Sequence, residues 1–328
     1  MPHTGETPQE KDINPQTTTT MIAFWNTSRG LRSIENWEPG CWAQVTCPTE
    51  EDIKFLENNL SIPGSFLSDI ADTDERARYD FDEGWTLIIL RIPYVKEVQS
   101  RAPYTTVPLG IVMRGNVCIT VCNYETNMMA DFINHQFKRG LGFTDAVDMV
   151  FRIFLSSSVW YLKILRQISS RIDEAKQHLV RKINNKDLMN LSRLQDSLTY
   201  FVTSIRGNET LLAKLKFKLP IDELDADLIE DVNIEMNQAR EMTCIYTNIL
   251  SRTMDTYANL INNNMADIMK TLTSVSIILM FPTLISSFFG MNLMNGMEAS
   301  SWGFPVVFVL TFVATTLIVL FFRRRTWI

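Results

Sequence analysis

The chain has 328 residues, a formal net charge of −6 and a mean hydropathy near zero, and this length predicts about two domains. The near-zero average hides a sharp break in composition, because the only ionisable residue between Thr271 and Phe322 is Glu298. Such a break argues against a wholly water-soluble protein. It indicates that the surroundings of the chain change from water to lipid.

The start of the chain lacks the features of a folded or exported segment. Residues 1–20 are polar, contain proline and are rich in threonine, so we expect a disordered tail without a cleavable signal peptide. The five cysteines form no CxxC pair, which favours reduced thiols in a cytosolic portion. The three histidines lie far apart, so we do not expect a zinc site built on them.

Residues 21–143 alternate short β-like segments with helical stretches, which predicts a cytosolic α/β domain. The predicted strands are Met21–Trp25, Cys41–Thr46, Trp85–Ile92, Val107–Met113 and Val117–Cys122. A Thr-x-x-Asp capping pattern opens a predicted helix over Thr49–Leu60. Arg114, Gly115 and Asn116 fit a tight turn between the last two strands.

The strand signal ends after Thr126, and apolar residues then recur every three or four positions. Residues 144–219 are predicted to form an antiparallel helical hairpin with a polar break near Asn184. A stalk helix is predicted over residues 220–268, and no Pro or Gly interrupts the chain before Pro282. A single helix running on into the first apolar run would span roughly 100 Å, and so long a helix needs neighbouring subunits.

Two uncharged apolar runs follow, each with about 20 residues, which is enough to cross a hydrocarbon core of about 30 Å. The predicted order is a first span over 269–290, an outer loop over 291–303, a second span over 304–322 and a basic cytosolic tail over 323–328. Lys270 directly precedes the first apolar run and Arg323–Arg325 follow the second, whereas the loop has no Lys or Arg. The positive-inside rule therefore predicts that both termini are cytoplasmic.

One face of the first predicted span carries a mixed polar and apolar stripe with steps of three and four residues. Its members are Met269, Leu272, Ser276, Met280, Thr283 and Ser287. Thr283 and Ser287 can hydrogen-bond a hydrated ion, whereas rings of the apolar members can dewet and close a path. The competing interpretation is ordinary helix packing, because Ser, Thr and Met are common at helix interfaces in membranes.

Four segments near the C-terminal end together resemble the CorA family of divalent cation channels. They are Tyr257-Ala-Asn-Leu-Ile-Asn262, Met269-Lys-Thr-Leu-Thr-Ser274, Pro282-Thr-Leu-Ile285 and Phe289-Gly-Met-Asn292. The resemblance implies an α+β cytosolic domain with a long stalk helix and two C-terminal transmembrane helices. It further implies a CorA-like homopentameric funnel in the inner (plasma) membrane, in contact with lipid, with no nucleic-acid partner and no enzymatic activity.

The resemblance also assigns roles to individual residues. It implies membrane-potential-driven Mg²⁺ uptake, with Co²⁺ or Ni²⁺ as further cargo, through a selectivity filter of Gly290, Met291 and Asn292. Neutral amide and carbonyl oxygens suit an ion that keeps its hydration shell, because they bind it weakly enough to release it. Glu298 is the one loop carboxylate that could attract cations.

A regulatory cytosolic Mg²⁺ site is implied between neighbouring subunits, with Asp255 on the stalk facing Glu97. Lys96 occupies the adjacent place where an acid is expected, so the sequence departs from the family pattern there. Two alternatives remain open at this stage: a membrane-anchored sensor or scaffold without transport, and a Zn²⁺ transporter of the same superfamily. No nucleophile elbow, HExxH motif or nucleotide-binding loop supports an enzyme.

Overall fold

The structure is a computed structural model that describes residues 22–27, 30–97, 100–140, 142–181, 185–221, 224–291, 302–325 and 327. The tail expected over residues 1–20 lies outside this described part. The chain divides into two compact units, which we call the first and second unit. The first unit comprises Met1–His178 and Asn184–Ser251, and the second comprises Leu179–Ile183 and Arg252–Ile328.

A seven-stranded mixed sheet forms the centre of the first unit. Its strands are β1 (Ile22–Asn26), β2 (Arg32–Ile34), β3 (Trp42–Thr46), β4 (Arg78–Asp82), β5 (Trp85–Val95), β6 (Tyr104–Arg114) and β7 (Val117–Cys122). The spatial order is β2-β1-β3-β7-β6-β5-β4, and β3 pairs with β7 in parallel while the other described pairs are antiparallel. All five predicted strands are confirmed, with β5 and β6 longer than expected.

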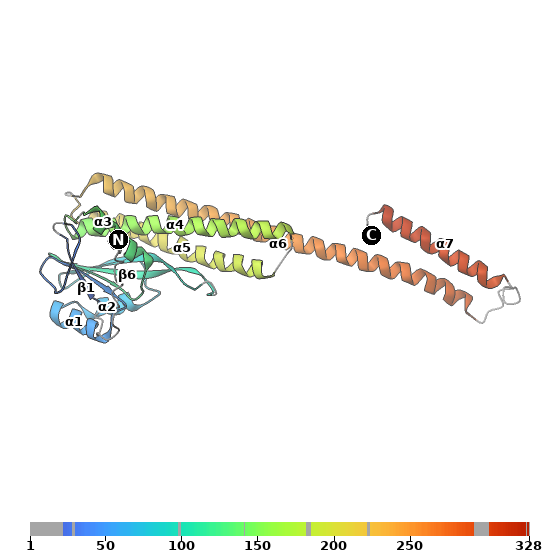
Figure 1. Ribbon diagram of the computed structural model, residues 1–328, viewed down its shortest axis with the longest axis horizontal. Helices are drawn as coiled ribbons and strands as arrows, with labels where there is room; N and C mark the ends of the chain where they lie inside the picture. Colours follow the sequence, from blue (N-terminus) through green and yellow to red (C-terminus); the bar gives the residue numbers. More distant parts are fainter. Residues whose placement is uncertain are drawn as a thin grey trace, which may run out of the picture. The chain divides into compact units, whose positions relative to one another are not determined.

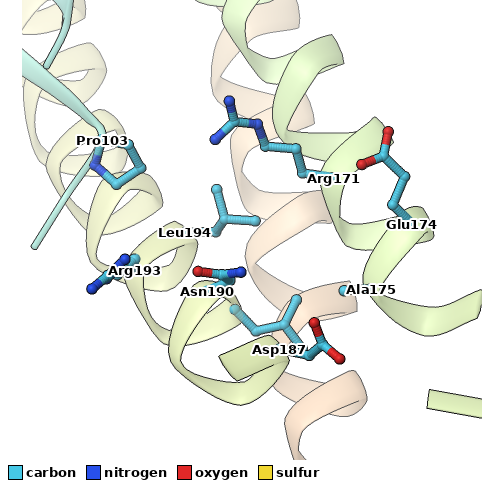
Figure 2. A pocket seen from close by; sticks show the side chains of 9 residues that line it. Pro103, Arg171, Glu174, Ala175, Asp187, Asn190, Arg193 and Leu194 are labelled. Atoms are coloured by element: carbon cyan, nitrogen blue, oxygen red, sulfur yellow. The ribbon is translucent and has the colours of Figure 1, made fainter. Parts of the chain in front are cut away.

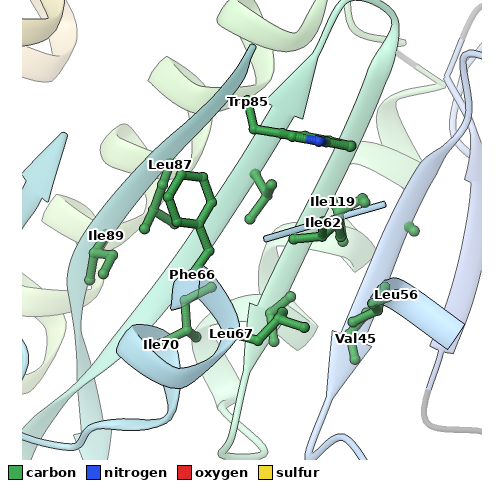
Figure 3. Close-up of a cluster of buried hydrophobic side chains, with 13 residues drawn as sticks. Val45, Leu56, Ile62, Phe66, Leu67, Ile70, Trp85, Leu87, Ile89 and Ile119 are labelled. Atoms are coloured by element: carbon green, nitrogen blue, oxygen red, sulfur yellow. The ribbon is translucent and has the colours of Figure 1, made fainter. Parts of the chain in front are cut away.

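Two short helices, α1 (Glu50–Leu60) and α2 (Gly64–Ala71), cover one face of the sheet (Figure 1). Phe66 and Ile70 of α2 are buried in one cluster with Leu87 and Ile89 of β5 (Figure 3). Gly110 of β6 makes this close approach possible, because a Cβ atom there would lie 2.2 Å from Ile70 Cδ1. The absence of one side chain thus sets the position of α2 on the sheet.

The N-terminus of α1 carries the predicted capping box. The Thr49 hydroxyl oxygen accepts a hydrogen bond from the Asp52 N–H at 3.2 Å, and the Asp52 carboxylate accepts one from the Thr49 N–H at 2.9 Å. Asp52 is 3% exposed, so the reciprocal pair lies against the core. The Thr-x-x-Asp signal is therefore confirmed as a helix start.

We expect Thr49→Ala to lower the stability by about 1 kcal/mol, because it leaves the Asp52 N–H without its acceptor. A thermal melt of the purified protein followed by circular dichroism should show a decrease in Tm of about 2–4 °C. Thr199→Ala is the matched control, since the exposed Thr199 hydroxyl donates only to the Gln195 carbonyl of its own helix. Equal melting temperatures for both variants would contradict a stabilising role for the cap.

Three helices cover the other face of the sheet: α3 (Asn127–Arg139), α4 (Ala146–Arg181) and α5 (Asn185–Lys218) (Figure 1). The ring of Tyr161 on α4 packs edge-on against Phe201 on α5, with centroids 5.0 Å apart. Further along, the Arg171 and Ala175 positions of α4 face Leu194 and Asp187 of α5 across a shared pocket (Figure 2). These pairings confirm the predicted antiparallel hairpin.

A buried polar network joins this hairpin to β5. Asn208 of α5 accepts a hydrogen bond from the Arg91 N–H at 3.0 Å and donates one to the Arg91 carbonyl at 2.7 Å. The Tyr161 hydroxyl donates to the same carbonyl at 2.9 Å. The Arg91 guanidinium donates to the backbone carbonyls of Thr73, Glu75 and Thr106. Burial lowers the pKa of Arg91, and these carbonyls compensate for the water that its charge has lost.

The helix α6 (Ala226–Phe289) is continuous over 64 residues and contains Pro282. Arg240 Nε lies 2.9 Å from Glu209 Oε1, and Lys216 Nζ donates to Asn233 Oδ1 at 2.7 Å, so α6 packs on α5 within the first unit. The same helix enters the second unit after Ser251. The sequence left open whether one helix runs from the soluble part into the first apolar run, and the structure shows that it does.

The second unit contains the rest of α6 and α7 (Gly303–Arg324). Both helices are long and apolar enough to cross a membrane, and the most apolar stretches have mean hydropathies of 1.8 and 2.6. At most 6% of either stretch is buried within the single chain. Helices this apolar and this exposed need lipid or other subunits around them.

Candidate functional site

The stripe predicted on the first span occupies one exposed face of α6. Met269, Leu272 and Met280 are 55–66% exposed, and Ser276, Thr283 and Ser287 are also exposed. The side chains that are buried or half-buried on this part of α6 are Ser274, Ile277, Ile278, Pro282 and Ile285. A helix with one partly covered face and one open face can bind α7 and a further partner simultaneously.

The open stripe lies on the opposite side of α6 from the covered face. Ser276, Met280 and Ser287 each follow a covered residue by two positions, namely 274, 278 and 285. Two residues turn an α-helix by about 200°, so the two sets point in opposite directions. α7 has a matching half-covered face at Gly303, Val307, Thr311, Ala314, Thr315 and Ile318. The predicted stripe is therefore not part of the covered face of α6.

The hydroxyl groups of the stripe are oriented by their own helix. Ser276 Oγ donates to the Leu272 carbonyl at 2.9 Å, and Thr283 Oγ1 donates to the Leu279 carbonyl at 3.0 Å. Each hydroxyl hydrogen is therefore already engaged, and the oxygen lone pairs remain free as acceptors. An acceptor oxygen suits the water hydrogens of a hydrated cation.

Gly290 directly follows the last residue of α6 and continues its hydrogen-bond pattern. Its N–H donates to the Ser286 carbonyl at 2.9 Å, and a Cβ atom at this position would lie 3.1 Å from that oxygen. Glycine therefore allows the last turn to close without steric conflict. Met291 is 49% exposed directly after it. The other predicted filter residue, Asn292, and the loop acid Glu298 lie outside the described residues.

The two residues predicted for the regulatory site belong to different units. Glu97 is exposed just after β5, where its carbonyl accepts hydrogen bonds from the Ser100 N–H at 3.0 Å and hydroxyl at 2.7 Å. Asp255 is exposed on α6. Both carboxylates are thus open to solvent in the single chain, and their pairing remains a prediction about neighbouring copies.

The described part of the chain contains no group of three or more His, Cys, Asp or Glu side chains that could hold a metal ion. A pocket of about 350 Å³ between α4 and α5 illustrates this (Figure 2). It has carboxylates at Glu174 and Asp187, but the side chain of Glu174 points away from that of Asp187. The described residues of the single chain therefore offer no preformed cluster of His, Cys, Asp or Glu ligands for a metal ion.

A model of the family described as "CorA-like Mg2+ transporter protein" matches residues 37–324, which is most of the chain. The chain belongs to the CorA family. It is 28% identical over 298 residues to the cobalt/magnesium transport protein CorA of Methanocaldococcus jannaschii, covering 88% of this chain and 91% of the relative. It is 22% identical over 295 residues to the protein of the same name from Thermotoga maritima, covering 88% and 83%.

A solved structure described as the complete CorA magnesium transporter of M. jannaschii has the same fold. It matches with a TM-score of 0.80 at 24% identity, covering 95% of this chain and all of the other. The match includes the α/β part, the long helix and the C-terminal apolar helices. The CorA-like fold predicted from the sequence is confirmed for the single chain.

The sequence predicts the exposed stripe on α6 of this CorA chain. It predicts no role for Ser274, which lies off that stripe. That side chain is fully buried, and its hydroxyl donates to the Lys270 carbonyl at 2.8 Å. Small residues allow close helix approach in membranes, which fits the burial of this side chain. The signal was present in the sequence, because the positions 274, 278 and 285 form a second periodic face that a search for polar stripes ignores.

Proposed function

We propose that this chain is the subunit of a homopentameric channel that carries divalent cations, foremost Mg²⁺, across the inner (plasma) membrane into the cytoplasm. The observation that carries the proposal is the exposed stripe of α6 on the side opposite its covered face. Relatives in M. jannaschii and T. maritima are named cobalt/magnesium transport proteins, which favours Mg²⁺ and Co²⁺ as cargo, with Ni²⁺ as a further candidate. We assign the chain no enzymatic activity.

A parallel oligomer is supported by an exposed apolar seam along α6. The seam comprises Met254, Ala258, Ile261, Met265, Ile268, Leu272, Val275 and Leu279, with alternating steps of four and three residues. That spacing is typical of helices that wind around each other. Six of these side chains, from Ile261 onward, are 37–66% exposed in the single chain. Copies of α6 placed side by side would bury the seam and turn the stripe toward a common axis, with Leu272 at the border between the two.

The ion would be held as a hydrate at the outer end of this axis. Backbone carbonyls of Gly290 and Met291, with the Asn292 amide, supply neutral acceptors for the hydrogens of the bound waters. Mg²⁺ loses its hydration shell reluctantly, so contacts through water spare it that cost. Further along, Thr283, Ser287 and Ser276 offer hydroxyl oxygens.

The same stripe supplies a closed state. Rings of Met280, Leu272 and Met269 would exclude water when the helices approach one another, and a dry segment blocks a hydrated ion. The driving force is the membrane potential, because a dication moving inward through 100 mV gains roughly 4–5 kcal/mol. Passive uptake therefore needs no nucleotide hydrolysis.

The membrane topology predicted from the sequence fits this function. Residues 269–290 and 304–322 are the two predicted spans. The predicted loop over 291–303 faces outward, with Glu298 as its carboxylate. The cytosolic portion consists of the α/β domain, the hairpin and the stalk over 220–268. Lys270 and the basic tail over 323–328 place both termini in the cytoplasm.

We further propose that cytosolic Mg²⁺ bound between Asp255 of one copy and Glu97 of the next holds the ring closed. We expect Asp255→Ala to raise the current at high internal Mg²⁺ by roughly fivefold or more, because the closing ion loses a ligand. Patch recordings across a series of internal Mg²⁺ concentrations measure this effect. Asp267→Ala is the control, since this acid of the same helix pairs with Lys270 at 3.1 Å. An unchanged current–Mg²⁺ relation for Asp255→Ala would remove the regulatory site and leave conduction intact.

The proposed transport is tested by measuring the flux of Mg²⁺, Co²⁺, Ni²⁺ and Zn²⁺ in one reconstituted preparation with an imposed potential. We expect Mg²⁺ uptake that rises with the inside-negative potential. Absence of flux for all four ions would favour the alternative, a membrane-anchored sensor or scaffold. Zn²⁺ flux that follows a proton gradient would favour the zinc-transporting alternative.

A further inference from the structure

The first unit has two exposed faces of opposite charge that cannot meet within one chain. The first lies on α6, where Glu230, Ile234, Glu241 and Ile245 are exposed. Each follows a buried residue by two positions, namely 228, 232, 239 and 243. Two residues turn a helix by about 200°, so this acidic face points away from the chain's own α4 and α5.

The second face is the groove between α3 and α4, with a volume of about 460 Å³. Leu155, Val159 and Trp160 form its apolar floor, and Val159 is 46% exposed. Lys138, Arg152 and the acid Asp131 line it, and the exposed Lys163 and Arg166 continue the basic face along α4. Asp148 offsets the charge of Arg152, since its Oδ1 lies 2.7 Å from Arg152 Nε. Lys163 Nζ lies 3.4 Å from Asp131 and 3.9 Å from the centroid of the Trp160 ring. A basic rim around an apolar floor complements an acidic helix face that carries isolated isoleucines.

One contact also shows which residues of α4 and α6 lie at the same height along the helix axes. Ser158 Oγ of α4 lies 3.8 Å from Met236 Sδ of α6, so positions 78 residues apart stand at the same level. α4 and α6 run parallel, because each is antiparallel to α5. Rotation about an axis along α6 preserves these levels from one copy to the next. At the same offset Arg152 is level with Glu230, Lys163 with Glu241 and Arg166 with Cys244.

We propose that the acidic face of α6 docks into the α3–α4 groove of the neighbouring copy. The partner is a second copy of this chain, and the contact is head-to-tail, with a different surface contributed by each copy. Such contacts close into a ring when the rotation fits, as a pentamer requires. The inference rests on the proposed oligomer and specifies which cytosolic surfaces hold it together.

Chemical crosslinking tests the predicted register directly. Cys244 is exposed on the acidic face, so Arg166→Cys places a second thiol at its level on the exposed face of α4 that continues from the groove. We expect a bismaleimide to produce a ladder of covalent multimers from the purified Arg166→Cys protein in detergent. The added substitution Cys244→Ser should abolish the ladder. Met189→Cys, on an exposed position of α5, is the control that retains Cys244 and should give no ladder.

The outcomes separate this interface from the proposed function. A wild-type protein that is monomeric by light scattering would contradict the proposed oligomer itself. An intact oligomer without a ladder in Arg166→Cys would overturn the interface alone. An equal ladder from Met189→Cys would also overturn it, because the contact would then lack specificity.

Charge reversal provides an independent readout. Lys163 and Glu241 have side chains that are 52% and 68% exposed, so reversing either is compatible with folding. We expect Lys163→Glu or Glu241→Lys alone to reduce oligomer stability about tenfold in dilution experiments, because like charges would then face each other. Both reversals in one chain should restore most of the stability, since every interface then holds the swapped pair. Within each chain, residue 163 would still repel Asp131 and residue 241 would still repel Arg240, so a small loss should remain. A double variant in which the two single losses simply add would contradict the pairing.

Discussion

Asn292→Ala is expected to reduce Mg²⁺ uptake into proteoliposomes by about 10- to 100-fold while the oligomer still assembles. The amide is proposed to hydrogen-bond waters of the hydrated ion, and a methyl group cannot accept a hydrogen bond. Gly290 already closes the last turn of α6 through its bond to Ser286, so the helix end does not depend on Asn292. Radiotracer or fluorescent Mg²⁺ flux at a fixed potential measures the loss.

Asn263→Ala is the matched control for this experiment. Asn263 is exposed on α6 outside the apolar stretch, on the side of the helix away from the proposed axis. The same chemical change there should leave uptake within about twofold of the wild type, as surface substitutions usually do. Uptake by Asn292→Ala at the wild-type rate would remove the filter assignment while leaving the fold and the family unaffected.

The elements that the sequence predicts well have a strong local period. Buried strands such as β5 and β7 and the helices α4 to α6 are long apolar patterns with clear ends. The two strands missed, β2 and β4, are short and polar, with the sequences RSI and RYDFD. Both lie at the edges of the sheet, where one side has no strand neighbour and charged residues are favoured. Such segments become strands because they pair with a neighbouring strand, and this pairing leaves no local pattern in the sequence.

The candidate site also has one part that the sequence predicts and another part that only the structure shows. The stripe through Ser276, Met280 and Thr283 is readable because a helical period places these residues on one face. Its relation to α7 is not readable from α6 alone, since it depends on which residues a second helix covers. The docking groove of the first unit is still harder to predict from the sequence. It combines residues of α3 and α4, and its height relative to α6 depends on the contact between Ser158 and Met236.

The contact between Asn208 and β5 is the clearest case of a feature hidden from the sequence, because 117 residues separate Asn208 from Arg91. Arg91 lies opposite Pro108 of β6 at a non-hydrogen-bonded position of the antiparallel ladder, so the Arg91 N–H and carbonyl point away from β6. On that side β4 ends its pairing at Arg78 opposite Ile89. The Asn208 amide takes the place of the missing strand residue, since it offers one acceptor and one donor.

We expect Asn208→Ala to destabilise the protein by roughly 2–4 kcal/mol, because the buried Arg91 N–H loses its partner and the carbonyl loses one of two. In thermal melts of the purified protein the Tm should fall by roughly 5–15 °C. Tyr161→Phe should cost less, since the Arg91 carbonyl keeps its bond from Asn208. Asn190→Ala, an exposed position on the same helix, should leave the Tm nearly unchanged. If Asn208→Ala melted like Asn190→Ala, water would be replacing the amide, and the hairpin would be held to the sheet by apolar packing alone.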